Sequence, residues 1–307
     1  MQKVVVAGGA GFIGSHLAEY YGNIGFEVFV IDNLRSGKKE NLEVINNLHF
    51  IEDSITNKDI VNDSIKDADY VFNFAALVSV PESIEKPYEC VDINVNGLLN
   101  LLEASKNFGV KKLVHVSSAA VYGDNPILPK KVTMNPEPKT PYSITKLDGE
   151  FYCKMYSEQF GLKTTSLRFF NVFGERQNPK SQYAAAVPIF IEKAVKNEDI
   201  TIYGDGLQTR DFIYVKDIVQ ACNLAANSQI ETGLFNVAYG KSITILDIAK
   251  TIIKLTDSKS KILFAPERAG DIKHSLAEVT ETFDILKFNP NWDLLKGLEA
   301  TIKYFKK

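Results

Sequence analysis

The chain has 307 residues, of which 45% are apolar and 24% charged, and its net charge at pH 7 is −3. This composition is typical of a globular protein with one large α/β domain, or with one such domain and a smaller lobe. The slightly acidic balance without a basic stripe excludes a nucleic-acid partner, and no apolar run approaches the roughly 18 residues of a membrane span.

The three cysteines are scattered along the chain, at Cys90, Cys153 and Cys222. An odd number without regular spacing fits a reducing compartment better than a disulfide framework, and none of the three has the spacing of metal ligands. The first strand-like run starts at Val4, so no cleavable leader is indicated. We therefore expect a cytoplasmic protein that uses no metal.

The first predicted element is a buried strand over residues 3–7, which runs into a glycine-rich segment and then a helix over 15–20. Glycines at 8, 11 and 14 permit a tight turn, a close approach of the backbone to a pyrophosphate, and close packing of helix on strand. The start of the helix adds free N–H donors. This order of elements predicts a dinucleotide site whose expected contacts are Gly8, Gly11, Phe12, Ile13 and Gly14.

The second predicted strand covers residues 28–31 and ends in Asp32. A carboxylate at this place can bind both hydroxyls of an adenosine ribose and repels a 2′-phosphate, which favours NAD over NADP. We expect Asn33 to contact the cofactor as well. Arg35 is near enough to leave NADP open, and an alternative is that Asp32 only closes a turn at the strand end.

Two more strands are predicted over residues 48–51 and 70–74. Asp53 and Ser54 follow the first of them, and Asp53 would accept a hydrogen bond from the adenine amino group. Ala75 and Ala76 follow the second, where small side chains let the backbone pass close to a ribose or nicotinamide. An ordinary strand-to-loop turn would explain the two alanines equally well.

A fifth strand is predicted to end at Ser118, and a helix is predicted to begin at Pro141. Tyr142 and Lys146 would share one face of that helix, so the ammonium group can lower the tyrosine pKa from about 10 toward neutrality. Such a tyrosine can act as a base, with Ser118 hydrogen-bonded to the substrate oxygen whose proton is taken. Alone, this spacing more often marks an exposed tyrosine beside a solvated lysine, and the glycine loop is what favours catalysis.

Strand and helix patterns keep alternating, with a helix over 95–102 and a strand over 164–168. They predict an α/β fold, a doubly wound parallel (Rossmann) sheet with ligands outside the carboxyl ends of its strands, where Ser54, Ala75 and Ser118 would lie. Shorter elements follow. We expect an NAD-binding domain in residues 1–172 and a smaller lobe in 173–307 that mainly binds substrate, with some segments returning to the first domain.

The sequence resembles the extended short-chain dehydrogenase/reductase family, and within it the UDP-sugar 4-epimerases. The resemblance covers nearly the whole chain. It is carried by the segments 8–16, 32–34, 94–97, 117–123, 142–146, 168–174, 203–212 and 268–271. Any one of them could be accidental, but their joint order is hard to obtain otherwise.

The resemblance implies that bound NAD⁺ oxidises C4 of a UDP-sugar: Tyr142 takes the hydroxyl proton while hydride passes to the nicotinamide. The 4-keto sugar then turns over in the pocket and takes the hydride back on its other face. Lys146 would lower the pKa of Tyr142 and hold the nicotinamide ribose, Ser118 would contact the sugar oxygen, and Asn94 would contact the cofactor. The family also implies a homodimer paired through the helices after Val95 and Tyr142.

Substrate contacts are also implied by the resemblance, residue by residue. Asn171 would hold the diphosphate or sugar, Arg210 and Arg268 the UDP phosphates, and Asp271 the uridine ribose. Guanidinium groups match phosphate oxygens in pairs, although an arginine is more commonly part of a surface ion pair. The full set of expected substrate contacts is Ser118, Asn171, Val187, Tyr203, Arg210, Arg268, Asp271 and Ser275.

Related dehydratases carry an acidic residue after the position of Ser118, and decarboxylases usually keep one at the second position. Here Ala119 and Ala120 stand there, and alanine cannot transfer a proton. Ser275 occupies a position where a large tyrosine restricts such epimerases to plain hexoses. Together with segment 178–187, it implies activity on UDP-GlcNAc/UDP-GalNAc as well as UDP-Glc/UDP-Gal.

Three alternatives stay open at this point. They are a UDP-glucuronate 4-epimerase, another nucleotide-sugar enzyme that forms a 4-keto sugar, and a non-catalytic NAD-binding sensor. One residue departs from the family pattern: Asn73 stands where histidine is common.

Overall fold

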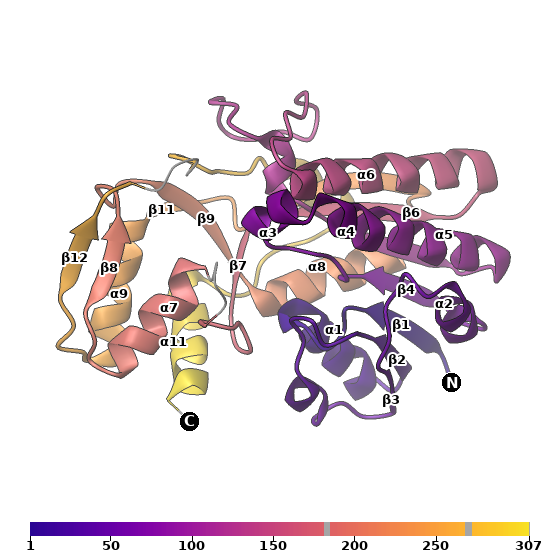
Figure 1. The fold of residues 1–307 in the computed structure, drawn as a ribbon, viewed down its shortest axis with the longest axis horizontal. Helices are drawn as coiled ribbons and strands as arrows, with labels where there is room; N and C mark the ends of the chain where they lie inside the picture. Colours follow the sequence, from indigo (N-terminus) through magenta and orange to yellow (C-terminus); the bar gives the residue numbers. More distant parts are fainter. Residues whose placement is uncertain (181–184, 268–271, 307) are drawn as a thin grey trace.

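The computed structural model describes residues 1–180, 185–267 and 272–306. Its larger lobe is built on a seven-stranded sheet with the strand order β10-β6-β5-β4-β1-β2-β3 (Figure 1). All neighbouring strands in it run parallel, which confirms the predicted doubly wound fold. The strands are β1 (Lys3–Ala7), β2 (Glu27–Ile31), β3 (Leu48–Ile51), β4 (Tyr70–Asn73), β5 (Lys112–Ser118), β6 (Thr164–Phe169) and β10 (Thr232–Val237).

Helices cover both faces of this sheet. Along β1, Val4 and Val6 join the core on one face, while Val5 and Ala7 join the core on the other, because successive side chains of a strand alternate. Burial on both faces explains why the strands are continuous apolar runs in the sequence. The covering helices are α1 (Phe12–Asn23), α8 (Val215–Asn227) and α10 (Thr280–Leu286) on one face, and α2 (Lys58–Ile65), α5 (Gly97–Asn107) and α6 (Pro141–Phe160) on the other.

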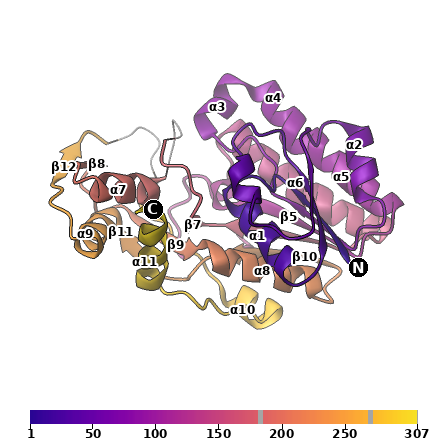
Figure 2. The ribbon, with the colours of Figure 1, turned by 90° about the horizontal axis from the view of Figure 1, so that it is seen from below.

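Parts of the chain beyond residue 173 belong to the larger lobe by their packing. Strand β10 extends the sheet next to β6, and it pairs Thr232 with Thr164 and Val237 with Phe169. Helices α8 and α10 pack against the same core as α1, and Figure 2 shows them side by side along one margin of the lobe. The chain therefore crosses between the lobes several times.

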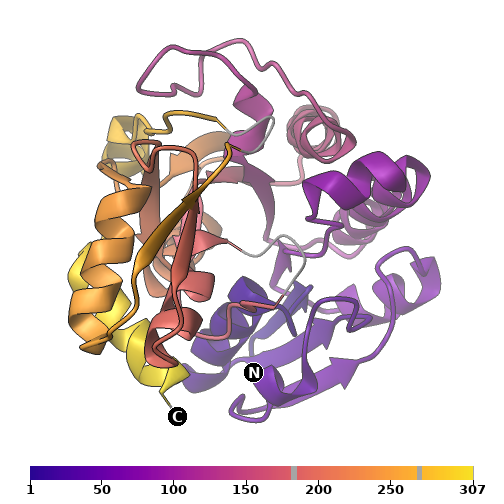
Figure 3. The same cartoon turned by 60° about the vertical axis from the view of Figure 1, so that its left-hand side comes forward.

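The smaller lobe has two short sheets with the orders β11-β9-β7 and β12-β8. Figure 3 shows the orange strands and helices of this lobe on the left, beside the indigo start of the chain. Its helices share one apolar core with the strands. These elements are β7 (Asn171–Phe173), β8 (Ile200–Tyr203), β9 (Thr209–Tyr214), β11 (Ser242–Thr244), β12 (Ile262–Ala265), α7 (Ala186–Val195), α9 (Ile245–Thr256) and α11 (Leu294–Phe305).

Short helical segments complete the connections after the parallel strands. They are η1 (Lys39–Leu42), α3 (Val80–Glu85), α4 (Pro87–Val91), η2 (Asp92–Asn96) and η3 (Ala119–Tyr122). The segment η2 is a single π-helical turn that leads into α5. Within the described ranges, no helix combines the length and the apolar character needed to cross a membrane.

Candidate active site

The helix that carries Tyr142 and Lys146 has a sharply defined start. Thr140 caps it: its side chain accepts a hydrogen bond from the Ser143 amide, and Ser143 bonds back to the Thr140 amide in a capping box. Pro141 follows at the first helical position, where its fixed φ suits a helix start. Local sequence therefore places Tyr142 in the first turn of α6, as predicted.

Ser118, Tyr142 and Lys146 line one cavity of about 480 Å³ at the carboxyl ends of the sheet strands. Lys146 Nζ donates a hydrogen bond of 2.8 Å to the Val116 carbonyl on β5, and it lies 5.9 Å from the centre of the Tyr142 ring. Ser118 ends β5, and its Oγ accepts a 3.2 Å hydrogen bond from the Ala120 amide. The structure thus brings the three expected catalytic residues together.

The pKa of Tyr142 differs from the expectation. Burial raises it above its usual value, and a hydrogen bond with the Ser118 side chain only partly opposes this shift. Burial also lowers the pKa of the Lys146 ammonium to about 8. The expected fall of the Tyr142 pKa toward neutrality is therefore not seen in the protein by itself, because desolvation outweighs the hydrogen bond that opposes it. The effect of the Lys146 charge on this pKa stays a prediction.

The glycine-rich loop lies against the loop that follows β4. A Cβ atom built on Gly8, whose φ is +75°, would lie 2.6 Å from the Ala75 amide nitrogen, and one on Gly14 would lie 2.3 Å from the Gly8 carbonyl oxygen. Both positions therefore require glycine. Together with the N-terminus of α1, this loop provides the bare backbone surface that a pyrophosphate needs.

Almost all expected cofactor residues line the same 480 Å³ cavity. They are Gly8, Gly11, Phe12, Ile13, Gly14, Asp32, Asn33, Asp53, Ser54, Ala75, Ala76, Tyr142 and Lys146. The long, continuous lining from the ends of β2 and β3 to Tyr142 fits a dinucleotide that spans several strand ends.

Asp32 also holds the loops around it. Its two carboxylate oxygens accept hydrogen bonds from the amides of Ala10, at 2.9 Å, and Leu34, at 2.8 Å. Burial raises the pKa of this carboxyl group, and the backbone hydrogen bonds oppose the shift. Asp32 therefore both closes the turn at the strand end and lines the cavity.

Asn94 differs from the other expected cofactor residues, because its amide group is used inside the protein. Its Oδ1 accepts a 2.7 Å hydrogen bond from the Leu77 amide, and its Nδ2 donates one of 2.9 Å to Thr145 Oγ1. This buried side chain joins the loop after β4 to helix α6. The structure thus gives Asn94 a supporting position behind the cofactor loop, and its expected direct contact with the cofactor stays a prediction.

Asn73 has a structural partner that the sequence did not suggest. It lies opposite His115 in the register of β4 and β5, and its Nδ2 is 3.4 Å from His115 Nδ1. Both side chains are buried. The departure from the family pattern is thus matched by a polar pair inside the sheet.

The cavity is also lined by residues that the sequence analysis did not single out, among them Lys38, Arg176 and Gln177. Arg176 donates a 3.2 Å hydrogen bond to Ser15 Oγ and forms an ion pair with Glu19, both on α1. The sequence did offer one indication of Arg176, because this residue stands two positions after the family-like segment 168–174. Nothing local to the sequence indicates that this loop folds back onto α1.

Two further cavities adjoin the first and hold the described substrate residues. One, of about 370 Å³, is lined by Asn171, Val187, Tyr203 and Arg210. The other, of about 300 Å³, is lined by Ser118, Asn171, Arg210 and Ser275. Ser118 connects it to the cofactor cavity. The expected residues Arg268 and Asp271 lie outside the described residues.

A buried ion pair fixes α6 against the sheet behind the catalytic residues. Arg168 on β6 donates hydrogen bonds of 2.8 and 2.7 Å to the two carboxylate oxygens of Glu150 on α6. Ser117, next to Ser118, donates to the same carboxylate. This bidentate contact sets the position of the helix that carries Tyr142 relative to the end of β5.

Comparisons with known proteins agree with this geometry. A UDP-N-acetylglucosamine 4-epimerase from Methanobrevibacter ruminantium M1, solved with UDP-N-acetylmuramic acid, is 43% identical, with a TM-score of 0.95 over 99% of this chain and 98% of that one. The UDP-glucose 4-epimerase of Thermotoga maritima, solved with UDP-glucose, is 37% identical, with a TM-score of 0.94 over the same shares. A UDP-N-acetyl-alpha-D-glucosaminuronate decarboxylase from Bacillus cytotoxicus is 33% identical over 99% of this chain and 98% of its own length.

The family model for the NAD dependent epimerase/dehydratase family matches residues 4–238, which include the glycine loop and the three expected catalytic residues. The resemblance inferred from the sequence is thereby confirmed, and NAD is the cofactor of the family. The chain belongs to the NAD dependent epimerase/dehydratase family.

Proposed function

We propose that this protein is a UDP-hexose 4-epimerase that works through a 4-keto intermediate. The observation that carries the proposal is the position of Ser118, which lines both the cofactor cavity and the 300 Å³ cavity beside Arg210 and Ser275. A sugar bound next to Ser118 therefore lies within reach of Tyr142. The complexes of the two related epimerases with UDP-sugars support this substrate class.

Bound NAD⁺ supplies the acceptor, and later the donor, of the hydride at C4 of the sugar. Tyr142 takes the proton of the C4 hydroxyl group, and Ser118 orients that oxygen by a hydrogen bond. Lys146 holds a positive charge beside the phenol, and its pKa of about 8 leaves it mostly protonated at neutral pH. Because burial raises the Tyr142 pKa, the base needs this charge and the positive nicotinamide ring to ionise.

The remaining residues bind rather than react. Gly8, Gly11, Phe12, Ile13, Gly14, Asp32, Asn33, Asp53, Ser54, Ala75 and Ala76 hold the dinucleotide, and Asn171, Val187, Tyr203, Arg210, Arg268, Asp271 and Ser275 hold the UDP-sugar. In this scheme residues 1–172 form the NAD-binding domain and residues 173–307 mainly bind the UDP-sugar. The segment that contains α8 and β10 returns to the first domain.

Two sugar classes are proposed as substrates, UDP-Glc/UDP-Gal and UDP-GlcNAc/UDP-GalNAc. Ser275 is small and lines the cavity beside Ser118, so an N-acetyl group at C2 has room there. Decarboxylation is disfavoured despite the related decarboxylase, because Ala119 and Ala120 offer no acid next to Ser118. A UDP-glucuronate 4-epimerase is the second candidate, supported by a structural neighbour of that activity that is 30% identical.

We also propose a homodimer in the cytoplasm. The resemblance pairs the subunits through α5 and α6. Of these, α6 exposes Ile144 and Phe151, and the neighbouring α4 exposes Tyr88 and Val91. Such a cluster on neighbouring helices is typical of a subunit contact. The three buried cysteines are unpaired, which fits a reducing compartment.

The test is to give purified protein UDP-GlcNAc and UDP-Glc in separate reactions without added cofactor and to follow C4 epimers by NMR. Conversion of both supports a broad epimerase that retains NAD. Conversion of UDP-Glc alone contradicts the Ser275 argument and leaves the mechanism standing. If neither sugar reacts, even with added NAD, and UDP-glucuronate does, the second candidate replaces the first.

A further inference from the structure

Arg35 poses a question about cofactor choice. It lies three residues beyond Asp32 and lines the same cavity as Asp32, Asn33 and Lys38. An arginine near this place is the residue that accommodates the 2′-phosphate of NADP in Rossmann proteins. The family uses NAD, so the structure must explain why this cation does not favour NADP.

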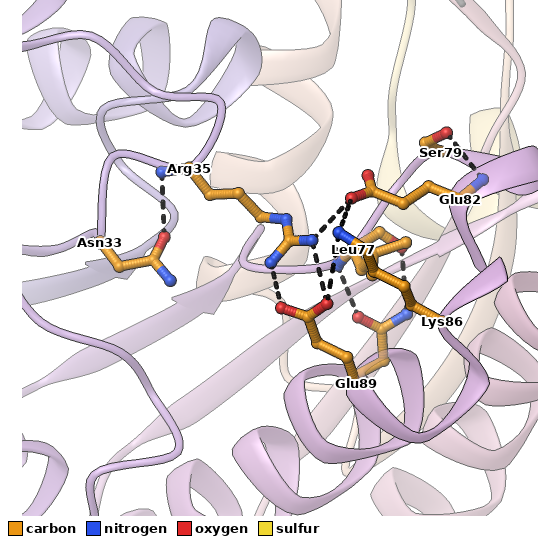
Figure 4. Close-up of polar contacts among 8 residues, drawn as sticks. Asn33, Arg35, Leu77, Ser79, Glu82, Lys86 and Glu89 are labelled. Atoms are coloured by element: carbon orange, nitrogen blue, oxygen red, sulfur yellow. Dashed lines mark hydrogen bonds and ion pairs between the residues drawn. The ribbon is translucent and has the colours of Figure 1, made fainter.

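The guanidinium group of Arg35 is bound by two carboxylates from the helices that follow β4 (Figure 4). Its Nη2 lies 2.7 Å from Glu82 on α3 and 3.2 Å from Glu89 on α4, and its Nη1 forms a second hydrogen bond with Glu89. Lys86 lies 3.3 Å from the same Glu82 oxygen. Both terminal nitrogens of Arg35 are therefore engaged.

Both sides of this ion cluster are anchored to the fold. The Arg35 amide donates a 3.1 Å hydrogen bond to Asn33 Oδ1, which holds the loop after β2. On the other side, Ser79 caps α3 by accepting a 3.2 Å hydrogen bond from the Glu82 amide. The Leu77 amide, two residues before Ser79, is bound to the buried Asn94. The carboxylates are thus presented to Arg35 by a prearranged segment.

The charges of the cluster balance. Hydrogen bonds to Arg35 lower the pKa of Glu82 and of Glu89, so both are ionised at neutral pH. Their two negative charges face the two positive charges of Arg35 and Lys86. A 2′-phosphate would have to displace both carboxylates from the guanidinium group, or lie beside them uncompensated. An exposed ion pair contributes little stability alone, but here two carboxylates together occupy the N–H donors that a phosphate would need.

We propose that Glu82 and Glu89 are specificity-determining residues of the cofactor site, because they hold the Arg35 guanidinium group and so withhold it from the 2′-phosphate of NADP. Asp32 disfavours that phosphate by repulsion. The two glutamates add a separate barrier, because they engage Arg35, the arginine three residues beyond Asp32 that could attract this phosphate. The choice of NAD then depends on two residues that do not themselves line the cavity.

The test compares the wild-type protein with Glu82→Gln, Glu89→Gln and the double variant. Each is equilibrated with mixtures of NAD⁺ and NADP⁺, and the retained dinucleotide is released by denaturation and quantified by mass spectrometry. We expect the double variant to raise the NADP⁺/NAD⁺ ratio about tenfold, the order of one charge-assisted hydrogen-bond pair, with NAD⁺ affinity within about threefold of wild type. The single variants should show smaller shifts.

Two controls separate this role from others. Glu85→Gln removes the same charge from α3 at an exposed residue that forms no ion pair within the described ranges, and it should leave the ratio unchanged. Adding Arg35→Ala to the double variant should abolish the gain. A gain that persists without Arg35 would overturn the proposal, as would an unchanged ratio. Weaker NAD⁺ binding without any gain of NADP⁺ would also overturn it, because the ion cluster would then support cofactor binding in general and would not select between the two dinucleotides.

Discussion

The two lobes place their functional residues in different ways. In the larger lobe these residues stand at the ends of strands in one parallel sheet, and buried contacts such as Arg168 with Glu150 fix the helix behind them. In the smaller lobe, Asn171, Tyr203 and Arg210 lie on short strands that border two adjoining cavities. This difference indicates that the two lobes have separate roles. Changes in the larger lobe should affect catalysis of every sugar, and changes in the smaller lobe should affect which sugar is bound.

The largest effect should come from Tyr142→Phe in the larger lobe. Loss of the proton-accepting oxygen should lower kcat by about 10²- to 10⁴-fold for both sugars, the usual contribution of a general base. Retained NAD, measured after denaturation, should stay the same. Tyr152→Phe, farther along α6, is the control. A full turnover rate in Tyr142→Phe would contradict the role of Tyr142 as the base. A wild-type protein that binds NAD without turnover, and that the substitution leaves unchanged, would support the sensor alternative.

Glu150→Gln tests the buried support of the catalytic helix. Removing one partner of a buried ion pair leaves the Arg168 charge uncompensated, and the free energy of unfolding should fall by about 3–5 kcal/mol in denaturant titrations. The matched control is Glu158→Gln, which removes the exposed α6 pair with Lys154, where we expect a loss below about 1 kcal/mol. Equal small losses in both variants would mean that the buried pair does not hold α6.

Arg210→Lys tests substrate binding by the smaller lobe. A lysine cannot bind two phosphate oxygens in a planar fork, so KM for both UDP-sugars should rise about 10- to 100-fold while kcat changes little. The inhibition constant of UDP should rise by the same factor, because the lost contact lies on the nucleotide. A fall in kcat with unchanged KM would break the proposed division between the lobes.

Ser275→Tyr should have the smallest effect and the most selective one. The larger side chain should lower kcat/KM for UDP-GlcNAc by about tenfold or more, while UDP-Glc changes by less than about threefold. Ser275→Ala, which keeps the space, should leave both sugars unaffected. If the tyrosine variant keeps full activity on the acetylated sugar, Ser275 does not control the size of the pocket.

The sequence predicted the larger lobe well because its signals are local. A buried strand, a glycine loop and a helix start are each encoded within about 15 residues, and the ends of parallel strands must share one edge. The position of Tyr142 in the first turn of α6 followed in the same way from Pro141. For that reason, most residues that the sequence assigns to the cofactor lie along one cavity.

Features that depend on distant parts of the chain could not be predicted. The sequence indicated that some later segments return to the first domain but not that β10 pairs with β6. This pairing, the bond between Asn94 and the Leu77 amide, and the effect of burial on the Tyr142 pKa all arise from packing. The partners of Arg35 stand 47 and 54 residues away. The sequence alone therefore does not show whether Arg35 could bind a 2′-phosphate. Only its contacts with Glu82 and Glu89 in the folded protein indicate that its guanidinium group is already engaged.

The most direct test of the central claim follows the hydrogen at C4. UDP-GlcNAc deuterated at C4 is incubated with the protein in ordinary water, and the epimer is examined by NMR and mass spectrometry. Hydride transfer to the bound cofactor and back predicts UDP-GalNAc that keeps the deuterium at C4. An epimer that has exchanged this deuterium for solvent hydrogen would contradict the account, because the C4 hydrogen would then leave as a proton.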